Sequence, residues 1–319
     1  NGWKIPSERT FNRRVDKIDI AIKTLKREGR DALRQLYPHQ ERTVRDMHAM
    51  QRINGDGYMH NVFVKFPDGE IRRPKTWYWQ DVYSRKIVGY RIDKTENTET
   101  IRLSFGDVVE KYGIPTEVTI DNTRAAANKT MTGGQKNRYR FKVKEDDQVG
   151  VFGLFGITVT WTSVSESGKG NGRAKPIERA FGKGGLGDYI DKQSAFSGAY
   201  TGENPMAKPD NYGETAVPLA DFAKVVASQI NAWNDREGRR SEMAAGIKSF
   251  NEVFEQSYAN TVPVKPTAEQ RHLFLLASEP VRVDRSGGIS TQAGSATGLR
   301  KNRYTADELL QYRNTKVVV

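Results

Sequence analysis

Two β-rich runs decide the fold of this chain: Thr76-Trp77-Tyr78-Trp79-Gln80-Asp81-Val82 and, four residues later, Ile87-Val88-Gly89-Tyr90-Arg91-Ile92. Both are rich in the aromatic and β-branched residues that favour strands. A third such run, from Tyr58 to Phe66, precedes them, and Pro67-Asp68-Gly69 supplies the turn residues that follow it. Together the three runs predict an antiparallel meander of three strands.

Beyond the meander, the pattern alternates between helix and strand. Asn97 is expected to cap a helix over residues 97–112, because apolar residues recur there at helical spacing and Gly113 follows. The other expected elements of this part are strands over 117–121 and 157–161, a basic insert over 123–150 and a helix over 175–181. A meander followed by strands that alternate with helices predicts a mixed α/β sheet with flanking helices.

The flanking segments differ in composition from this centre. Ser7 can cap a helix whose apolar stripe runs from Phe11 to Leu25. Either this helix follows the turn of a helix-turn-helix, at residues 3–6, or it is an ordinary amphipathic helix. The other expectations are a polar, basic linker over 30–50, a surface excursion over 184–216, helices over 219–233 and 249–257, and short β-like runs beyond Pro263 with a last strand at 316–319.

The charge of the chain favours a polyanionic partner. Its 319 residues include 51 Lys and Arg against 39 Asp and Glu, which gives a formal net charge of +12. Such a balance favours nucleic acid first and an anionic membrane surface second, with a merely soluble basic protein as the alternative. No run of about eighteen apolar residues occurs, so we expect no membrane-spanning segment. The absence of Cys excludes disulfides and thiolate zinc sites and fits a reducing cytoplasm.

Three acidic residues lie in contexts that differ from an ordinary solvated surface. Asp121 directly follows an apolar β-like run, where burial would make an uncompensated charge costly. Asp56 lies between two glycines at the start of the first expected strand, where the backbone can approach a ligand closely. Glu178 lies on an expected helix among the cations Lys175 and Arg179. Asp, Asp and Glu in this order suit carboxylates that hold two divalent ions for phosphoryl transfer.

Other acidic residues and motifs compete with this interpretation. With 39 acidic residues, solvated surface carboxylates remain the alternative for each member. Glu166 is the main rival for the third position, while Asp68 and Asp81 belong to a turn and a hairpin. The sequence Gly182-Lys183-Gly184-Gly185-Leu186-Gly187 fits a dinucleotide motif, but it follows an expected helix instead of a strand, so that interpretation fails.

Several longer phrases carry a resemblance to a known family. They are Ile53-Asn54-Gly55-Asp56-Gly57-Tyr58, Arg73-Pro74-Lys75-Thr76-Trp77, Thr119-Ile120-Asp121-Asn122-Thr123-Arg124, Asn137-Arg138-Tyr139-Arg140-Phe141-Lys142, Glu178-Arg179-Ala180-Phe181-Gly182 and Lys208-Pro209-Asp210-Asn211-Tyr212-Gly213. Over essentially its whole length the chain resembles the transposases of bacteriophage Mu and Mu-like phages.

This resemblance implies an RNase H-like fold of the retroviral-integrase type and a DDE recombinase. Carried over by position, Asp56, Asp121 and Glu178 are the catalytic, metal-binding triad. The resemblance implies two Mg²⁺ ions, for which Mn²⁺ can substitute. It also implies nicking at each end of the element to free a 3′-OH, followed by attack of that hydroxyl on target DNA. The alternatives are an RNase H-like metal nuclease that only hydrolyses DNA and a catalytically inactive DNA-binding regulator.

The resemblance also implies an organisation and a set of partners. Residues 1–40 would be the C-terminal part of a helix-turn-helix DNA-binding domain with its linker, 41–260 the catalytic domain, and 261–319 a small, truncated β-barrel. The expected partners are the element ends and target DNA, further copies of the chain in a homotetramer on paired ends, and an ATP-dependent target-capture protein, with no membrane partner. The expected location is the cytoplasm of a bacterial host cell.

Basic and polar side chains are expected to contact the DNA. Those near Glu178 and those in the insert would bind phosphates without reading sequence, while the first helix could reach the major groove. The expected contacts are Thr10, Asn12, Arg13, Arg138, Arg140, Lys142, Lys169, Arg173, Lys175, Arg179, Arg300, Lys301 and Arg303. Four of these cations lie near Glu178 in the sequence: Lys169, Arg173, Lys175 and Arg179. The alternative for these four is a basic surface that contacts only solvent.

Overall fold

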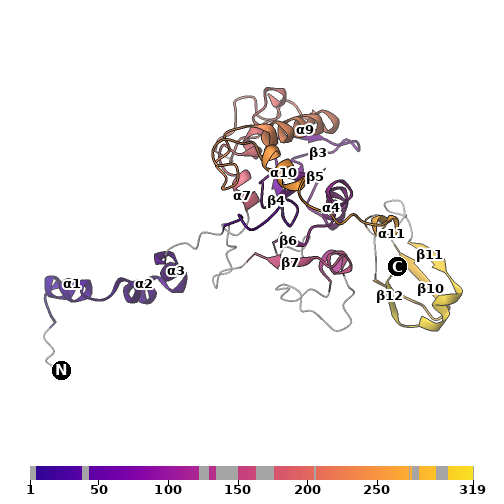
Figure 1. Cartoon of the computed structure of the whole chain (residues 1–319), viewed down its shortest axis with the longest axis horizontal. Helices are drawn as coiled ribbons and strands as arrows, with labels where there is room; N and C mark the ends of the chain where they lie inside the picture. The colour runs from indigo at the N-terminus through magenta and orange to yellow at the C-terminus, as the bar shows by residue number, and fades with distance from the viewer. Residues whose placement is uncertain are drawn as a thin grey trace.

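A five-stranded mixed sheet forms the centre of the chain (Figure 1). The computed structural model describes residues 5–37, 43–121, 129–133, 150–162, 176–204, 206–272, 274, 280–291 and 301–318. The strands are β1 (Arg52–Met59), β4 (Lys75–Asp81), β5 (Ile87–Asp93), β6 (Glu117–Ile120) and β7 (Thr158–Trp161), in the order β5-β4-β1-β6-β7. β4 runs opposite to the other four strands: it pairs antiparallel with β1 and β5, whereas β1 pairs in parallel with β6 and β6 with β7. The expected mixed α/β sheet of the RNase H-like type is confirmed.

The first strand begins earlier than the sequence predicted. The expected strand over 58–66 is wrong, because β1 covers Arg52–Met59 and Asp56 lies inside it. The Gly-Asp-Gly segment has low strand propensity, but β4 on one side and β6 on the other provide its ladder hydrogen bonds. A Cβ at Gly55 would lie 2.6 Å from the Trp79 ring, so glycine is what lets this ring cross the strand.

Short strands and helices fill the connections around the sheet. The turn at Pro67–Gly69 links β2 (Val64–Lys65) to β3 (Ile71–Arg72), and β2 also pairs with β8 (Val217–Pro218). The described parts near and within the expected basic insert contain α5 (Lys129–Thr132) and α6 (Val151–Leu154).

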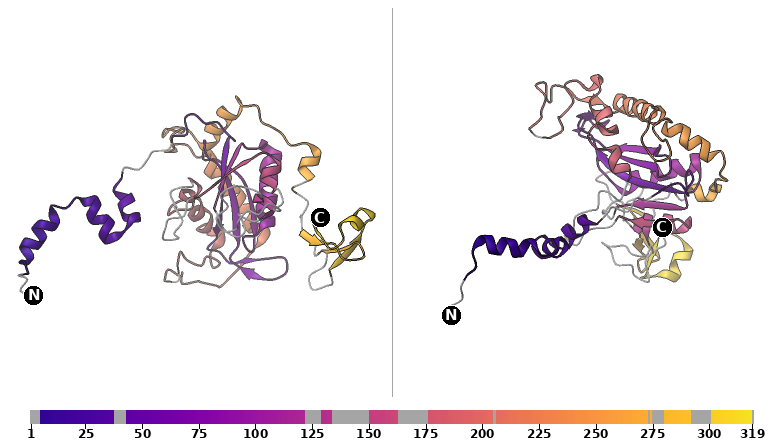
Figure 2. Two further views of the ribbon diagram at one scale, coloured as in Figure 1. Left: turned by 90° about the horizontal axis from the view of Figure 1, so that it is seen from below. Right: turned by 60° about the vertical axis from the view of Figure 1, so that its left-hand side comes forward.

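Helices cover both faces of the sheet, as the two views of Figure 2 show. On the α4 face, Ile53, Trp79 and Val118 pack with Phe105 of α4 (Thr98–Tyr112), which Asn97 caps as expected. On the α9 face, Tyr78 packs with helices α7 (Pro176–Ala180), α8 (Leu186–Asp191) and α9 (Leu219–Asp235). Since strand side chains alternate between faces, Asn54, Asp56 and Tyr58 belong to the α9 face.

The expected surface excursion over 184–216 is only partly a surface segment. It contains α8 and a short 3₁₀ helix, η1 (Ser194–Phe196), and the side chains of Leu186, Ile190 and Phe196 are almost fully buried. Its high content of Gly, Pro and Asn hid these few anchoring residues, which pack against α9. Part of this segment therefore belongs to the core on the α9 face.

The N-terminal region consists of three short helices that extend away from the sheet (Figure 1). The expected single stripe from Phe11 to Leu25 is divided between α1 (Glu8–Asp16) and α2 (Ile20–Glu28), because Asp19 caps a new helix. The expected linker over 30–50 contains α3 (Arg30–Leu36). Ser7 caps α1 as predicted, accepting a hydrogen bond from the Thr10 amide.

The C-terminal region follows α10 (Phe250–Tyr258), whose capping box between Ser249 and Glu252 is confirmed. After α11 (Ala268–His272), β9 (Pro280–Arg282) pairs with β12 (Lys316–Val318), and β10 (Gly288–Thr291) pairs with β11 (Asn302–Thr305), with η2 (Asp307–Tyr312) beside them. Among the described residues these strands form two separate two-stranded sheets, so closure into a barrel is not confirmed. In the same ranges, no helix has both the length and the apolarity needed to cross a membrane.

Candidate active site

Asp56 and Asp121 lie at equivalent positions on neighbouring parallel strands. Asn54 of β1 pairs with Thr119 of β6. Asp56 comes two residues later within β1, and Asp121 comes two residues later, directly after the end of β6. Parallel neighbours lie about 4.8 Å apart and side chains two residues apart share a face, so the register directs both carboxylates to the α9 face. Both residues are half-buried. The order of the strands therefore brings together two acidic residues that are far apart in the sequence.

Helix α7, which carries Glu178, is attached to β1 on both sides of Asp56. At its start, the Ile177 amide donates to Oδ1 of Asn54 at 3.2 Å. Just beyond its end, the ring of Phe181 stacks on Tyr58, with 5.0 Å between ring centroids. Because Asn54 and Tyr58 flank Asp56 on the same face of the strand, α7 lies over the strand segment that bears this aspartate.

The three acids are not assembled into a closed metal site. Among the described residues, no three Asp, Glu or His side chains form a group that could hold a metal ion. The fold thus brings Asp56, in the central strand β1, and Asp121, directly after β6, to one face of the sheet. Half-buried Glu178 lies on the helix over that face, without completing the set. Their chemistry fits the implied ion, because hard divalent cations such as Mg²⁺ prefer oxygen ligands and all three residues supply carboxylates.

The sequence did not predict a buried hydrogen-bond network that lies between the end of β1 and α8. Asp191 at the end of α8 is 1 % exposed and accepts from the Tyr58 hydroxyl at 2.9 Å and the Asn61 amide at 2.8 Å. Its other oxygen lies 2.6 Å from Nδ1 of His60, which is fully buried. A Cβ at Gly187 would lie 2.5 Å from the Tyr58 ring, so this glycine permits the close approach. The polar residues Tyr58 and His60, on the same strand face as Asp56, were the available signal.

The two rival acids within the described residues, Asp81 and Asp68, take part in other contacts. Asp81 is fully buried and accepts hydrogen bonds from the Met50 amide and from the amide and hydroxyl of Ser84, at 2.6 to 2.9 Å. Its burial raises the pKa of this carboxyl above the usual value, against the effect of those donors. Asp68 is exposed and pairs with Lys94. The third rival, Glu166, lies outside the described residues.

The expected DNA contacts are only partly within the described residues. Asn12, Arg13, Arg179 and Lys301 are exposed, and Thr10 is half-buried on α1. Arg303 is exposed too, but it forms an ion pair with Asp284 at 2.7 Å. The donors around it lower the pKa of Asp284 to about 2, first the Ser286 hydroxyl and then the Gly288 amide. The expected contacts outside the described residues are Arg138, Arg140, Lys142, Lys169, Arg173, Lys175 and Arg300.

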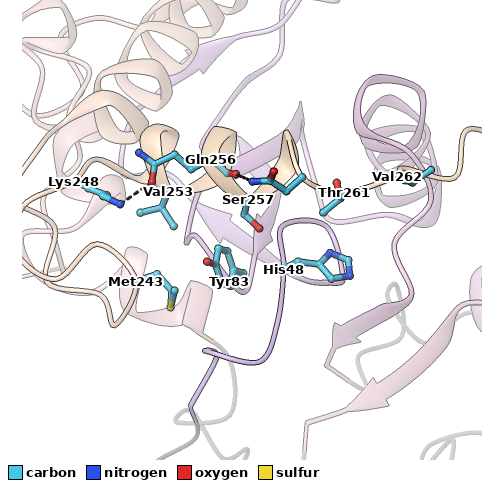
Figure 3. Close-up of a pocket in the computed structure, with 10 residues that line it drawn as sticks. His48, Tyr83, Met243, Lys248, Val253, Gln256, Ser257, Thr261 and Val262 are labelled. Carbon is cyan, nitrogen blue, oxygen red and sulfur yellow. Dashed lines mark hydrogen bonds between the residues drawn. The ribbon is translucent and has the colours of Figure 1, made fainter.

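A cavity of about 590 Å³ lies away from the three acids, beside α10 (Figure 3). Its lining combines polar and apolar side chains, among them His48, Tyr83 and Met243, and Lys248 donates to Gln256 at 2.7 Å. It contains none of the predicted site residues, so its size does not make it the candidate active site.

Two models of known protein families match consecutive parts of this chain. Residues 44–259 match the family model described as bacteriophage Mu transposase, and residues 1–43 match the model described as Mu DNA binding, I gamma subdomain. The chain belongs to the bacteriophage Mu transposase family.

A curated relative resembles the chain along its full length. The Mu-like prophage FluMu transposase A of Haemophilus influenzae is 48% identical over 324 residues, a match that covers 100% of this chain and 47% of that protein. The chain therefore spans about half the length of this relative.

Solved structures give weaker likenesses. The HTLV-2 integrase catalytic core domain in complex with magnesium (trimeric form) matches with a TM-score of 0.35 and 14% identity, covering 65% of this chain and 98% of that one. The simian T-cell lymphotropic virus intasome in complex with PP2A regulatory subunit B56 gamma matches with a TM-score of 0.38 and 14% identity, covering 90% and 83%. The fold assignment rests on the order and direction of the strands in the sheet.

Proposed function

We propose that this chain is the catalytic part of a DNA transposase. It would nick DNA at the ends of a mobile element to free a 3′-OH and join that hydroxyl to target DNA. One observation carries the proposal: Asp56 and Asp121 end up at matching positions on parallel strands, under the helix that bears Glu178. Membership of the Mu transposase family supports the same reaction class.

Asp56, Asp121 and Glu178 are the residues that would hold two Mg²⁺ ions, with Mn²⁺ as a substitute. Such ions, when bound, activate the attacking oxygen and stabilise the leaving oxygen of a phosphodiester. The protein supplies the two aspartates from interior strands of the sheet and the glutamate from a helix attached to β1. Residues on sheet strands hold their positions better than residues on loops, which suits a reaction that depends on alignment.

The basic side chains would position the DNA. Arg179 lies next to Glu178, and the insert cations Arg138, Arg140 and Lys142 would contact the sugar-phosphate backbone without reading bases. Lys169, Arg173, Lys175, Arg300, Lys301 and Arg303 would do the same, whereas Thr10, Asn12 and Arg13 on α1 could reach base edges. We further propose a homotetramer on paired ends and an ATP-dependent target-capture partner. The proposed domains are the DNA-binding part at 1–40, the catalytic domain at 41–260 and the small β domain at 261–319.

A strand-transfer assay with precut element ends and target DNA tests the function. We expect Mg²⁺-dependent joined product from the parent chain, loss of joining in Asp56→Asn and Glu178→Gln, and DNA affinity close to that of the parent in both. Glu166→Gln is the control and should keep its activity. Hydrolysis without joined product would instead favour the nuclease alternative. DNA binding with neither joining nor cleavage would favour the regulator.

A further inference from the structure

Arg85 occupies a strained position in the turn between β4 and β5. Its φ is 71°, in the left-handed region that favours glycine and asparagine over long side chains. The turn holds it there, because its amide donates to the Asp81 carbonyl at 2.9 Å and its carbonyl accepts from Nε2 of Gln80 at 3.0 Å. Strain of this kind concentrates at functional sites, so the side chain at this position calls for an explanation.

One nitrogen of the Arg85 guanidinium, Nη1, lacks an acceptor. Within the described part of the chain, its Nη1 is buried and makes no hydrogen bond. The two nearest negative charges, Asp81 and Glu242, are engaged by other donors. Asp81 accepts from Met50 and Ser84, and both oxygens of Glu242 accept from the segment Thr43–Arg45. A buried donor of a charged group without an acceptor is costly, and a bound anion would relieve that cost.

The charge of a second guanidinium, that of Arg179 on α7, acts on the first. Burial lowers the pKa of Arg85, and the positive charge of Arg179 lowers it further, against the opposite effects of Asp81 and Glu242. The sheet connects these two residues. Gln80, whose side chain donates to the Arg85 carbonyl, pairs across the strands with Asn54, and Asn54 accepts a hydrogen bond from the start of α7. The turn that carries Arg85 and the helix that carries Arg179 and Glu178 are therefore attached at facing positions of two adjacent strands.

We propose that Arg85 and Arg179 form a phosphate clamp, which binds a backbone phosphate of the DNA next to Asp56 and Glu178. The proposal rests on the function proposed above. Planar guanidinium groups match the oxygens of a phosphate in pairs, which a single lysine cannot do. A phosphate would offset the repulsion between the two arginines and supply the acceptor that Nη1 lacks. The residue would thus be retained in a strained conformation because of the ligand it binds.

The replacement Arg85→Gly separates this role from a structural one. Glycine suits a φ of 71° and removes the buried, unpartnered charge, so the melting temperature should equal or exceed that of the parent. Binding to a duplex that carries the element end is measured without metal at several salt concentrations. The slope of log K against log salt should fall by about one unit, as expected for one lost phosphate contact. Joining of precut ends should fall at least ~10-fold, as expected from lost positioning.

Two controls make the result decisive. Arg85→Lys keeps the charge and should recover part of the affinity, while Arg91→Gln, on the opposite face and paired with Asp107, should leave the salt slope unchanged. An unchanged slope in Arg85→Gly would overturn the proposal, as would a lower melting temperature with normal joining. A third result would also overturn the proposal: inorganic phosphate binds to the parent chain at Arg85, but Arg85→Gly binds DNA as tightly as the parent does. Failure of the proposed function would give a different result: the parent chain would bind DNA with the expected salt slope but would form no joined product.

Discussion

At the residue scale, the contacts of Tyr58 connect the strand of Asp56 with the end of α7 and with α8. Its hydroxyl donates to buried Asp191, and its ring stacks on Phe181. Burial, together with the charge of Asp191, raises the pKa of the Tyr58 phenol well above its usual value. The phenol therefore stays protonated, and remains a donor, at any pH at which the protein would be assayed.

Removing only the hydroxyl of Tyr58 tests this contact. In Tyr58→Phe the stacking on Phe181 remains, but Asp191 loses one of its donors, so the free energy of unfolding should fall by about 1–2 kcal/mol. Urea denaturation followed by circular dichroism measures the change. Tyr90→Phe on β5 is the control, because the Tyr90 hydroxyl makes no hydrogen bond within the described residues. Equal stability of the two variants would show that Asp191 does not depend on Tyr58.

Adding one methyl group at Gly187 tests the close approach from the other side. A Cβ there would lie 2.5 Å from the Tyr58 ring, so the ring or α8 must move, at a cost of about 1–3 kcal/mol. Gly182→Ala is the matched control, since its Cβ would meet the nearest atom at 3.5 Å, an ordinary contact. Thermal melts of both variants measure the difference. A Gly187→Ala protein as stable as the control would contradict the described packing.

At the element scale, local signals were predictable and long-range pairings were not. Asn97 and Ser249 cap α4 and α10 as the sequence predicts, because a cap depends on a few neighbouring residues. By contrast, the bounds of β1 depend on its pairing with β4 and β6. The position of α8 depends on Asp191, whose hydrogen-bond partners Tyr58 and His60 lie more than a hundred residues earlier in the sequence. The aspartates of the candidate site were chosen from the sequence, but their adjacency depends on the strand order.

The capping box of α10 gives a pH-dependent prediction. Hydrogen bonds from the Ser249 amide and hydroxyl lower the pKa of Glu252 below its usual value of 4.5. A lowered folded-state pKa means that this stabilisation is present above pH 4.5 and is lost as the pH falls through the folded-state value. Glu252→Gln should therefore be less stable than the parent at pH 7 and approach it in acid, as measured by denaturation at both pH values. A stability gap that does not change with pH would contradict this.

At the scale of the whole molecule, the positive charge should govern binding to DNA. The net charge of +12 favours a polyanion, and several of the exposed cations lie on the elements proposed to contact phosphates. If six or more phosphates are neutralised, the binding constant should fall by ~10³-fold or more between 50 and 200 mM salt. Fluorescence anisotropy with a labelled duplex measures this dependence. An affinity that is insensitive to salt would exclude a binding mode based on the phosphate backbone.

We propose that Asp56 and Asp121, with Glu178, form one metal-dependent site. The most direct test is a crystal structure of the chain soaked in Mn²⁺, with anomalous diffraction to locate the ions. We expect an anomalous peak between the carboxylates of Asp56 and Asp121, and loss of that peak in Asp121→Asn. Mn²⁺ bound at other residues, with no peak between these two aspartates in a chain that still joins DNA, would contradict it.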